Sequence, residues 1–309
     1  MLPILTVTLN PAVDKFMVVP GFCAGAESHC SHSYEVAGGK GINVSRMLKR
    51  LNVDTIATGI LGGGRGQFIS RELLRENIPA DFQLLQEETR LNLTLTDPLK
   101  GQTTRVLESG PEVKPADIRA FKKRYSYLLN SCQVVVFSGS CMRGFKEDVY
   151  QSLIQQARKK GVKTVLDSSG KFLRSGLKAG PDCVKPNRQE AEDVLGQSIC
   201  SRSDLKAALA TLNPRRVVLL SLGEEGLAAT DGKKAWTVRP PSVKIRNTVG
   251  CGDALLAGFL YAEIHGYEFP ERLCYAVAAG TAHALRRIPG YASKAVFLKT
   301  KRILKAVPL

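Results

Sequence analysis

The feature that most constrains the fold of this chain is a regular alternation of apolar, β-branched runs with segments of helical periodicity. The apolar runs are residues 4–9, 54–61, 133–140, 163–169 and 216–223. Amphipathic segments such as INVSRMLKRL and KEDVYQSLIQQARKKG lie between them. This alternation predicts parallel strands with helices on both faces, which is an α/β fold with a doubly wound, mostly parallel sheet. Ligands of such sheets bind at the carboxyl ends of the strands.

Two stretches interrupt the alternation. Residues 13–36 and 90–108 read as short strands joined by turns, and the segment LNLTLTD alternates apolar and polar residues. Each stretch is inserted between α/β units. We therefore expect a small discontinuous β-sheet, built from both insertions, that covers the strand ends as a lid. Because the chain has no internal repeat or linker, residues 1–309 are expected to form a single domain with this lid.

The N-terminal residues, the lengths of the apolar runs and the cysteine spacing argue against a secreted, a membrane-spanning and a zinc-binding protein. The start MLPILTVTLNPAVDK is apolar for too few residues to act as a signal peptide. No window approaches the run of about 18 apolar residues typical of a membrane span, so we expect a cytoplasmic protein without a membrane partner. The eight cysteines include no C-x-x-C pair, which favours buried, reduced thiols. The group Cys23, His29, Cys30 and His32 lacks the usual zinc spacing, which favours loop residues over a metal site.

The net charge of +16 is the unusual bulk property. A balance this basic is compatible with nucleic acid, an acidic surface or a polyanionic small substrate. The basic residues occur in twos and threes along the whole chain, without a basic tail or interleaved aromatic residues. Solvated helix faces account for most of them, and the pattern disfavours a nucleic-acid partner.

The segment from residue 247 to 258, NTVGCGDALLAG, carries the strongest chemical signal. Gly250 and Gly252 flank the small residue Cys251 directly before a long helical run. Backbone amides would converge there at a helix N-terminus, where the helix dipole also favours negative charge. Asp253 in the first turn is either a helix cap or a group that accepts a proton from an attacking hydroxyl.

The segment T-V-G-C-G-D-A-x-x-A-G resembles the second signature of the PfkB, ribokinase-like carbohydrate kinases. The resemblance implies that Asp253 is the catalytic base and that the amides of residues 250–252 stabilise the transferring phosphoryl group. Cys251 stands where the family more usually has Ala or Ser, and it is small enough to keep the turn.

Two N-terminal segments resemble the sugar-binding motifs of the same family. The segment G-G-K-G-I-N at 38–43 is similar to the first signature, which implies that the backbone at Gly39 approaches the sugar and that Asn43 holds its hydroxyl groups. The segment N-P-A-V-D, ending at Asp14, resembles N-P-x-x-D, whose Asp also binds sugar hydroxyls. From the residues alone, Lys40 would be a solvated lysine and Asp14 a turn residue.

Three residues bear on whether the sugar carries a phosphate. Arg90 and Ser140 match positions that the phosphofructokinase branch uses to bind the sugar phosphate, and Lys40 adds a second cation. Arginine suits bidentate phosphate binding. Without the resemblance, Arg90 would read as a solvated side chain.

The segment V-K-P-N-R-Q-E follows a strand and opens a helix. Asn187 and Glu190 have the spacing of a capping box. The resemblance implies in addition that Lys185 and Asn187 contact the nucleotide, and that Asn187 and Glu190 organise Mg²⁺ through water. The two roles are compatible.

Two further segments resemble nucleotide-binding parts of the family. The segment S-L-G-E-E-G resembles the family loop S-L-G-x-x-G along the nucleotide phosphates, which assigns Ser221, Gly223 and Gly226 to nucleotide binding. A plain hairpin turn is the alternative. Gly280, in the helical run CYAVAAGTAHAL, would leave room for a flat adenine ring.

The resemblance covers nearly the whole chain in family order, with one departure. Gly64 stands where many members carry an aspartate in G-x-x-G-x-D, and this departure bears on loop structure or sugar preference more than on activity.

The function implied is ATP- and Mg²⁺-dependent phosphorylation of a ketohexose phosphate. Fructose 1-phosphate, giving fructose 1,6-bisphosphate, is the expected substrate, because the motifs look most like those of 1-phosphofructokinases. Alternatives are a tagatose-6-phosphate kinase, a minor 6-phosphofructokinase, a nucleoside or free-sugar kinase, and a non-catalytic regulator that senses sugar or binds nucleic acid. A homodimer joined through the lid is also expected, since an exposed β edge is better covered than open.

Overall fold

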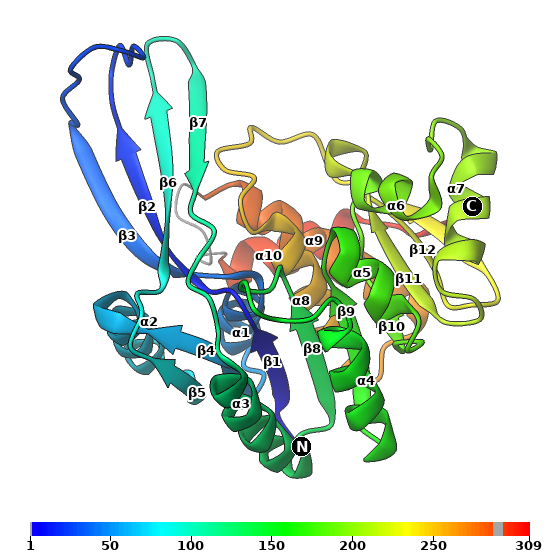
Figure 1. The fold of residues 1–309 in the computed structure, drawn as a ribbon. Coiled ribbons are helices and arrows are strands. Elements are labelled where there is room, and N and C mark those ends of the chain that lie inside the picture. The colour runs from blue at the N-terminus through cyan, green and yellow to red at the C-terminus, as the bar shows by residue number, and fades with distance from the viewer. Residues whose placement is uncertain (1, 287–292) are drawn as a thin grey trace.

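The computed structural model describes residues 2–286 and 293–309, and its centre is a ten-stranded sheet (Figure 1). Seven neighbouring strands run parallel, in the spatial order β5 (Ala80–Leu85), β4 (Thr55–Gly62), β1 (Ile4–Thr8), β8 (Val134–Ser138), β9 (Lys163–Asp167), β10 (Cys183–Val184) and β11 (Val217–Ser221). The edge beyond β11 is antiparallel and consists of β12 (Leu227–Thr230), β13 (Ala235–Val238) and β14 (Val307–Pro308).

Helices cover both faces of this sheet (Figure 1). One layer contains α3 (Pro115–Leu128), α4 (Val149–Lys159), α5 (Gly170–Leu177), α6 (Arg188–Leu195) and α7 (Arg202–Leu212). The other contains α1 (Lys40–Arg50), α8 (Cys251–Ile264), α9 (Phe269–Ala284) and α10 (Lys294–Ile303). Strand β8 shows why both faces are buried, since Val135 and Phe137 enter the first core and Val134 and Val136 the second. The expected doubly wound, mostly parallel α/β class is confirmed.

A second sheet of four strands projects from the main sheet as a separate blade (Figure 1). Its order is β3 (His32–Gly38), β2 (Ala12–Val18), β6 (Arg90–Asp97) and β7 (Gln102–Leu107). The central pair β2 and β6 is parallel, and it places Asp14 opposite Asn92, whereas both outer pairs are antiparallel. The sheet combines the two segments that interrupt the sequence pattern, and we call it the lid. Helix α2 (Gly63–Arg75) packs at its base.

Cysteine burial differs in part from the expectation. All eight cysteines are free, and Cys132, Cys141, Cys183 and Cys274 are buried. The other four are exposed or half-buried, because they lie in loops or at a helix end. None of the helices in the described part of the chain has the length and apolar character to cross a bilayer.

Candidate active site

A cavity of about 900 Å³ lies between the lid and the carboxyl ends of the parallel strands. Its walls come from the lid, the start of α1, the segment before α6, the β11–β12 turn, the N-terminus of α8 and one face of α9. The lining contains most of the predicted site residues: Asp14, Gly39, Lys40, Asn43, Arg90, Lys185, Asn187, Glu190, Ser221, Gly223, Gly226, Gly250, Cys251, Gly252, Asp253 and Gly280. Segments distant in the sequence therefore meet in one site.

The turn before α8 forms one wall of the cavity. Gly250 is the N-cap of α8 and has a φ of +85°, a backbone conformation that glycine adopts without steric cost. The amide of Cys251 donates to the Thr248 carbonyl at 3.2 Å, within the turn. The first N–H groups of a helix have no acceptor inside it, so those of Gly252 and Asp253 are available to an anion. Of the three predicted amides, the Cys251 amide is thus occupied by the turn itself.

Asp253 is a buried carboxylate at the helix N-terminus. Its side chain is 5% exposed, and its Oδ2 accepts a hydrogen bond of 2.8 Å from Nδ2 of Asn43. Burial, and then the negative charge of Asp167, raise the pKa of Asp253 to about 6. The group is therefore mostly ionised at pH 7, yet basic enough to accept a proton.

Asp167, at the end of β9, is fully buried between two lysines. Its Oδ1 lies 3.0 Å from Nζ of Lys40 and 3.2 Å from Nζ of Lys185. Burial alone would raise the pKa of Asp167, but the two lysines outweigh it and hold the pKa below its ordinary value. Sequence reasoning missed this residue, although its place at the carboxyl end of a predicted strand was a usable signal.

Lys40 is engaged by carboxylates. Besides Asp167, its Nζ lies 3.5 Å from Oε1 of Glu190. Burial lowers the pKa of Lys40, but the charges of Asp167, Glu190 and Asp253 raise it above the ordinary value overall. Lys40, which the sequence suggested as a second cation for a sugar phosphate, lines the cavity and is already paired with two carboxylates.

The lid contributes a polar pair to the cavity. Nδ2 of Asn92 donates to Oδ1 of Asp14 at 2.8 Å, across the β2–β6 pair. Burial is the main reason why the pKa of Asp14 lies above its ordinary value. A Cβ at Gly38 would lie 2.2 Å from Oδ2 of Asp14, so this position of the G-G-K-G motif requires glycine. The paired Asp14 and Asn92 offer both acceptors and donors to the hydroxyl groups of a ligand.

Two arginines face the same region. Arg90 donates to three backbone carbonyls, those of Asn10 at 3.0 Å, Glu108 at 3.2 Å and Pro11 at 3.4 Å. A guanidinium has five N–H donors, so Arg90 keeps donors for a ligand. Burial, and then the positive charge of Arg105, lower the pKa of Arg90, although Asp14 opposes the shift.

Arg105 on β7 also lines the cavity, and sequence reasoning missed it because QTTRVL carries no motif.

Ser140 is the remaining residue that the sequence suggested for the sugar phosphate. Among the described residues, the set that lines the cavity does not include Ser140, whose hydroxyl accepts a hydrogen bond of 3.2 Å from Asn10. Its neighbour in the motif, Gly139, donates its amide to the Asp167 carbonyl at the end of β9.

The predicted capping box is present at the start of α6. The amide of Glu190 donates to Oδ1 of Asn187 at 2.8 Å, and the amide of Asn187 donates to Oε2 of Glu190 at 2.9 Å. Both side chains line the cavity. The structural role and a role in ligand binding are thus compatible, as the sequence suggested.

The segment from Ser221 to Gly226 is a hairpin turn between β11 and β12, and it also lines the cavity. A Cβ at Gly226 would lie 2.1 Å from the Val238 carbonyl, which explains the glycine. Gly280 lies on α9, facing the first turn of α8, where a Cβ would lie 3.3 Å from the Cys251 carbonyl.

Comparison with known proteins agrees with this geometry. The sequence model described as pfkB family carbohydrate kinase matches residues 5–293. The chain belongs to the pfkB family of carbohydrate kinases. It is 34% identical to the tagatose-6-phosphate kinase of Staphylococcus epidermidis, covering 93% of this chain and 94% of that one. It is also 34% identical to the 1-phosphofructokinase of Borreliella burgdorferi, covering 92% of each chain.

Among solved structures, the tetrameric inhibited form of phosphofructokinase-2 from Escherichia coli superposes with a TM-score of 0.90 at 27% identity. The match covers 98% of this chain and 99% of that one. This pfkB kinase is therefore a sugar-phosphate kinase, a phosphotransferase that acts on an alcohol group.

The acidic residues of the kinase fit a magnesium ion that keeps most of its water. Within residues 2–286 and 293–309, no group of three or more His, Cys, Asp or Glu side chains is placed to hold a metal. This finding covers Cys23, His29, Cys30 and His32. Oδ2 of Asp167 is buried and has no hydrogen-bond partner among the described residues. Mg²⁺ commonly uses one or two carboxylates together with substrate phosphates, which suits Asp167 and Glu190.

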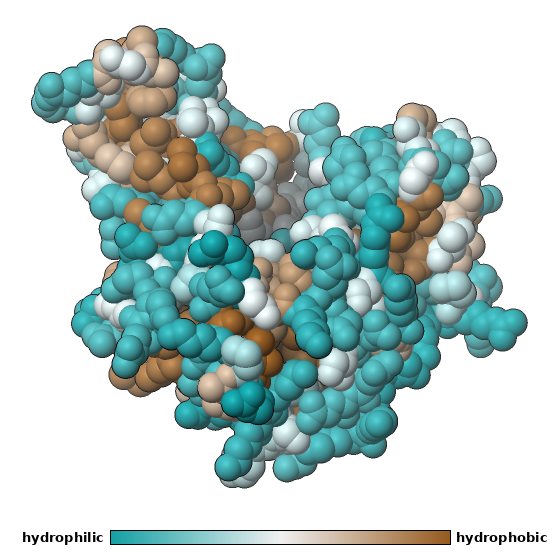
Figure 2. Space-filling view, in the orientation of Figure 1, coloured by the Kyte–Doolittle hydropathy of each residue, from teal (hydrophilic) through white to brown (hydrophobic). Residues whose placement is uncertain are grey.

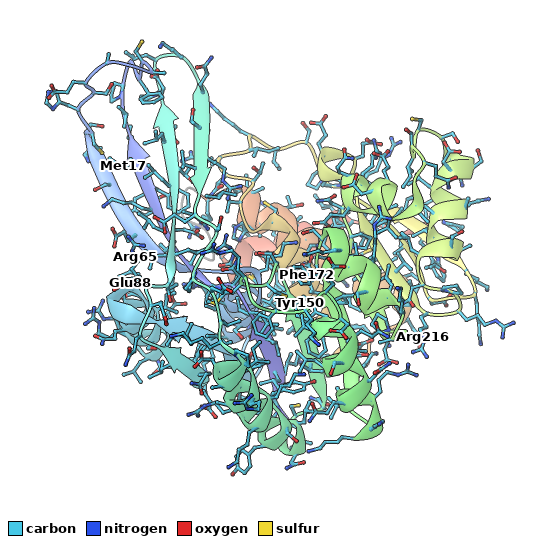
Figure 3. The ribbon with its side chains drawn as sticks, in the orientation of Figure 1. Met17, Arg65, Glu88, Tyr150, Phe172 and Arg216 are labelled. Carbon is cyan, nitrogen blue, oxygen red and sulfur yellow. The ribbon has the colours of Figure 1, made fainter. Side chains whose placement is uncertain are left out.

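The departure at Gly64 has a local explanation (Figure 3). The carboxylate of Glu88 accepts the amides of Gly64 at 2.8 Å and Arg65 at 3.1 Å, at the N-terminus of α2. A Cβ at Gly63 would lie 2.3 Å from the carboxyl carbon of Glu88. The kinase thus places an acid from a different segment at this helix end, beside the base of the lid.

Proposed function

We propose that this kinase transfers the γ-phosphoryl group of ATP to a hydroxyl group of a ketohexose phosphate. The observation that carries the proposal is the convergence of Arg90 and Arg105 with Asp14 in the cavity that also contains Asp253. A nucleoside or a free sugar needs hydroxyl ligands but no pair of arginines. A phosphorylated sugar needs both, because guanidinium groups bind phosphate with charge-assisted hydrogen bonds.

Asp253 acts as the base in this proposal. With a pKa of about 6, it is ionised at neutral pH and takes the proton from the attacking hydroxyl group. The hydrogen bond from Asn43 fixes the carboxylate in one orientation. The amides at the N-terminus of α8 donate to the phosphoryl oxygens, where negative charge accumulates during transfer.

ATP is proposed to lie across three segments that line the cavity: residues 185–190, 221–226 and 250–252. Asp167 and Glu190 would hold Mg²⁺, which neutralises phosphate charge when it is bound. Lys185, whose side chain is 4% exposed, keeps Asp167 ionised for that purpose. The lid would cover the sugar and exclude water, which limits hydrolysis of ATP.

The favoured acceptor is fructose 1-phosphate, phosphorylated at O6. The order of motifs supports it, as does similarity to a 1-phosphofructokinase. Equal identity to a tagatose-6-phosphate kinase makes tagatose 6-phosphate the main competitor, followed by fructose 6-phosphate.

A coupled-enzyme assay of ADP formation tests the proposal, with fructose 1-phosphate, fructose 6-phosphate, tagatose 6-phosphate, free fructose and a nucleoside as acceptors. We expect the highest kcat/KM with fructose 1-phosphate. Preference for another ketohexose phosphate would contradict only the narrower assignment. Preference for free fructose or the nucleoside would contradict the whole proposal.

We also propose a homodimer joined through the lid. Register places Met17, Leu93, Leu95 and Val106 on the lid face opposite Asp14 and Asn92. These four apolar side chains are half-buried or exposed. Apolar residues gather over the lid strands (Figure 2), and Met17 is labelled in Figure 3. A partner subunit would remove this apolar face and the lid edges from water. The inhibited form of the related phosphofructokinase-2 is tetrameric, so a similar chain can self-associate, which supports the proposal.

A further inference from the structure

His283, in the last turn of α9, is a buried residue that the proposed mechanism does not use. Its side chain is 2% exposed, and Nε2 lies 2.8 Å from the carbonyl oxygen of Val249. A carbonyl only accepts, so Nε2 must carry the hydrogen. The other ring nitrogen, Nδ1, is buried and has no hydrogen-bond partner within the described part of the chain. As far as the structure describes the chain, the bond to Val249 is therefore the one polar contact of this ring.

The surroundings of the ring favour its neutral form. Burial is the main cause that lowers the pKa of His283, the positive charge of Arg46 lowers it further, and the bond to Val249 opposes both. A leucine of similar size would avoid the cost of burying an unpaired Nδ1. The histidine is thus a poor choice for packing alone, and the Val249 bond is what distinguishes it from an apolar residue.

The Val249 carbonyl belongs to the same peptide group as the Gly250 amide. In a planar trans peptide the C=O and N–H bonds point in opposite directions. When His283 holds the carbonyl oxygen on the α9 side, the N–H of Gly250 is directed to the other side of the turn. Val249 and Gly250 both line the cavity, beside the N-terminus of α8.

Without this contact, the peptide group could turn about the axis between its two flanking α-carbons. Gly250 tolerates φ values of either sign, so the chain itself sets little barrier to turning the amide away. The imidazole ring also packs directly against Gly250, because a Cβ there would lie 3.0 Å from Nε2 and 3.2 Å from Cε1 of His283. One ring thus holds the peptide by its oxygen and by the α-carbon that follows.

We propose that His283 is a positioning residue that holds the Val249–Gly250 peptide with the Gly250 N–H directed at the transferring phosphoryl group. This inference rests on the proposed function of the site. His283 acts on the reaction through the backbone of the turn. Loss of one such donor typically lowers kcat about 10²–10³-fold, and a donor that is misdirected for part of the time costs less.

The test compares His283→Leu with His283→Gln, whose side-chain amide can still donate to Val249. For the leucine variant we expect kcat to fall by about tenfold or more, KM for the sugar phosphate to stay within twofold, and Tm to be unchanged or higher. The glutamine variant should recover most of kcat. His265→Leu, at the exposed end of α8, is the matched control and should leave kcat unchanged.

A second measurement does not need an acceptor. Calorimetric titration compares adenosine 5′-O-(3-thiotriphosphate) with ADP, which differ in the terminal group that the Gly250 amide would contact. We expect the preference for the triphosphate, measured as the ratio of the two Kd values, to fall several-fold in His283→Leu and to be kept in His283→Gln.

If His283→Leu keeps both this preference and its kcat, the inference is wrong. It is also wrong if Tm and kcat fall together in both variants, because that result indicates a purely structural role. Wild-type protein that retains the triphosphate preference but phosphorylates no ketohexose phosphate would instead contradict the proposed function.

Discussion

At the scale of single residues, the proposed chemistry of this kinase depends on one buried carboxylate, Asp253. Replacement of Asp253 by Asn keeps the shape and an acceptor for the Asn43 amide, but it removes the base. We expect kcat to fall by about 10²-fold or more, while ATP binding survives. Steady-state kinetics together with calorimetric titration of ATP checks both parts. A near-normal kcat in Asp253→Asn would remove Asp253 from this role.

The pKa of Asp253 also makes a prediction about pH. In the proposed mechanism activity needs the ionised form, so kcat/KM should fall below pH 6 with the slope of one proton.

The contribution of Asp253 to the stability of the folded protein should change in the opposite direction and fall as pH rises. Because folding raises this pKa, the ionised carboxylate destabilises the folded protein, and the penalty grows as pH rises from about 4 through 6. Asp253→Asn should therefore raise Tm at pH 8 and make little difference at pH 4. An equal change in Tm at both pH values would contradict the raised pKa.

Arg90 is predicted to determine the affinity for the sugar phosphate. Arg90→Ala should raise KM for that substrate by about 10–100-fold, which is the loss of a charge-assisted contact of about 1.5–3 kcal/mol. KM for ATP should not change. Arg105→Ala should act in the same direction, and Arg124→Ala on α3, an exposed arginine that pairs with Asp81, is the control. An unchanged KM for the sugar phosphate in Arg90→Ala would argue against a phosphorylated substrate.

At the scale of elements, the turn that begins α8 should tolerate little change. Gly250→Val adds branched atoms at a φ of +85° and brings Cβ to 3.0 Å from His283. We expect turnover to collapse, with a lower Tm because of the left-handed backbone. Far-UV circular dichroism should still show the native α/β content. Gly266→Val, at a φ of +75° with no neighbour within 4 Å of its Cβ, controls for backbone strain alone and should keep its activity.

Elements with a local signal could be predicted from the sequence. Strands β1, β4, β8, β9 and β11 are apolar and β-branched, and each was expected within two residues of its observed bounds. Strand β10 has two residues and β12 is rich in alanine, so neither carries a periodic signal.

Site residues likewise divide into those that a local motif reveals and those that it does not. Glycines and Asp253 belong to motifs, whereas the role of Lys40 depends on Asp167, 127 positions away, and no local pattern reveals that ion pair.

At the scale of the whole molecule, the lid is predicted to control assembly. Leu95→Lys together with Val106→Lys places charges on the apolar lid face and should convert a dimer into monomers, as measured by light scattering after size-exclusion chromatography. Leu84→Lys, at a position that is 65% exposed on β5 of the main sheet, is the control. A wild-type monomer, or a lid variant that remains dimeric, would contradict the proposed interface.

The position of β1 in the middle of the main sheet affects how the chain folds while the ribosome synthesises it. All five residues of β1 are buried, and its two neighbours are β4 and β8. A nascent chain must therefore extend past Ser138 before its first strand can be enclosed on both sides. Pairings this distant in sequence form late, because closing the intervening loop costs entropy before any contact compensates for it. During that interval an apolar strand is exposed near the start of the chain, where it can bind chaperones or other incomplete chains.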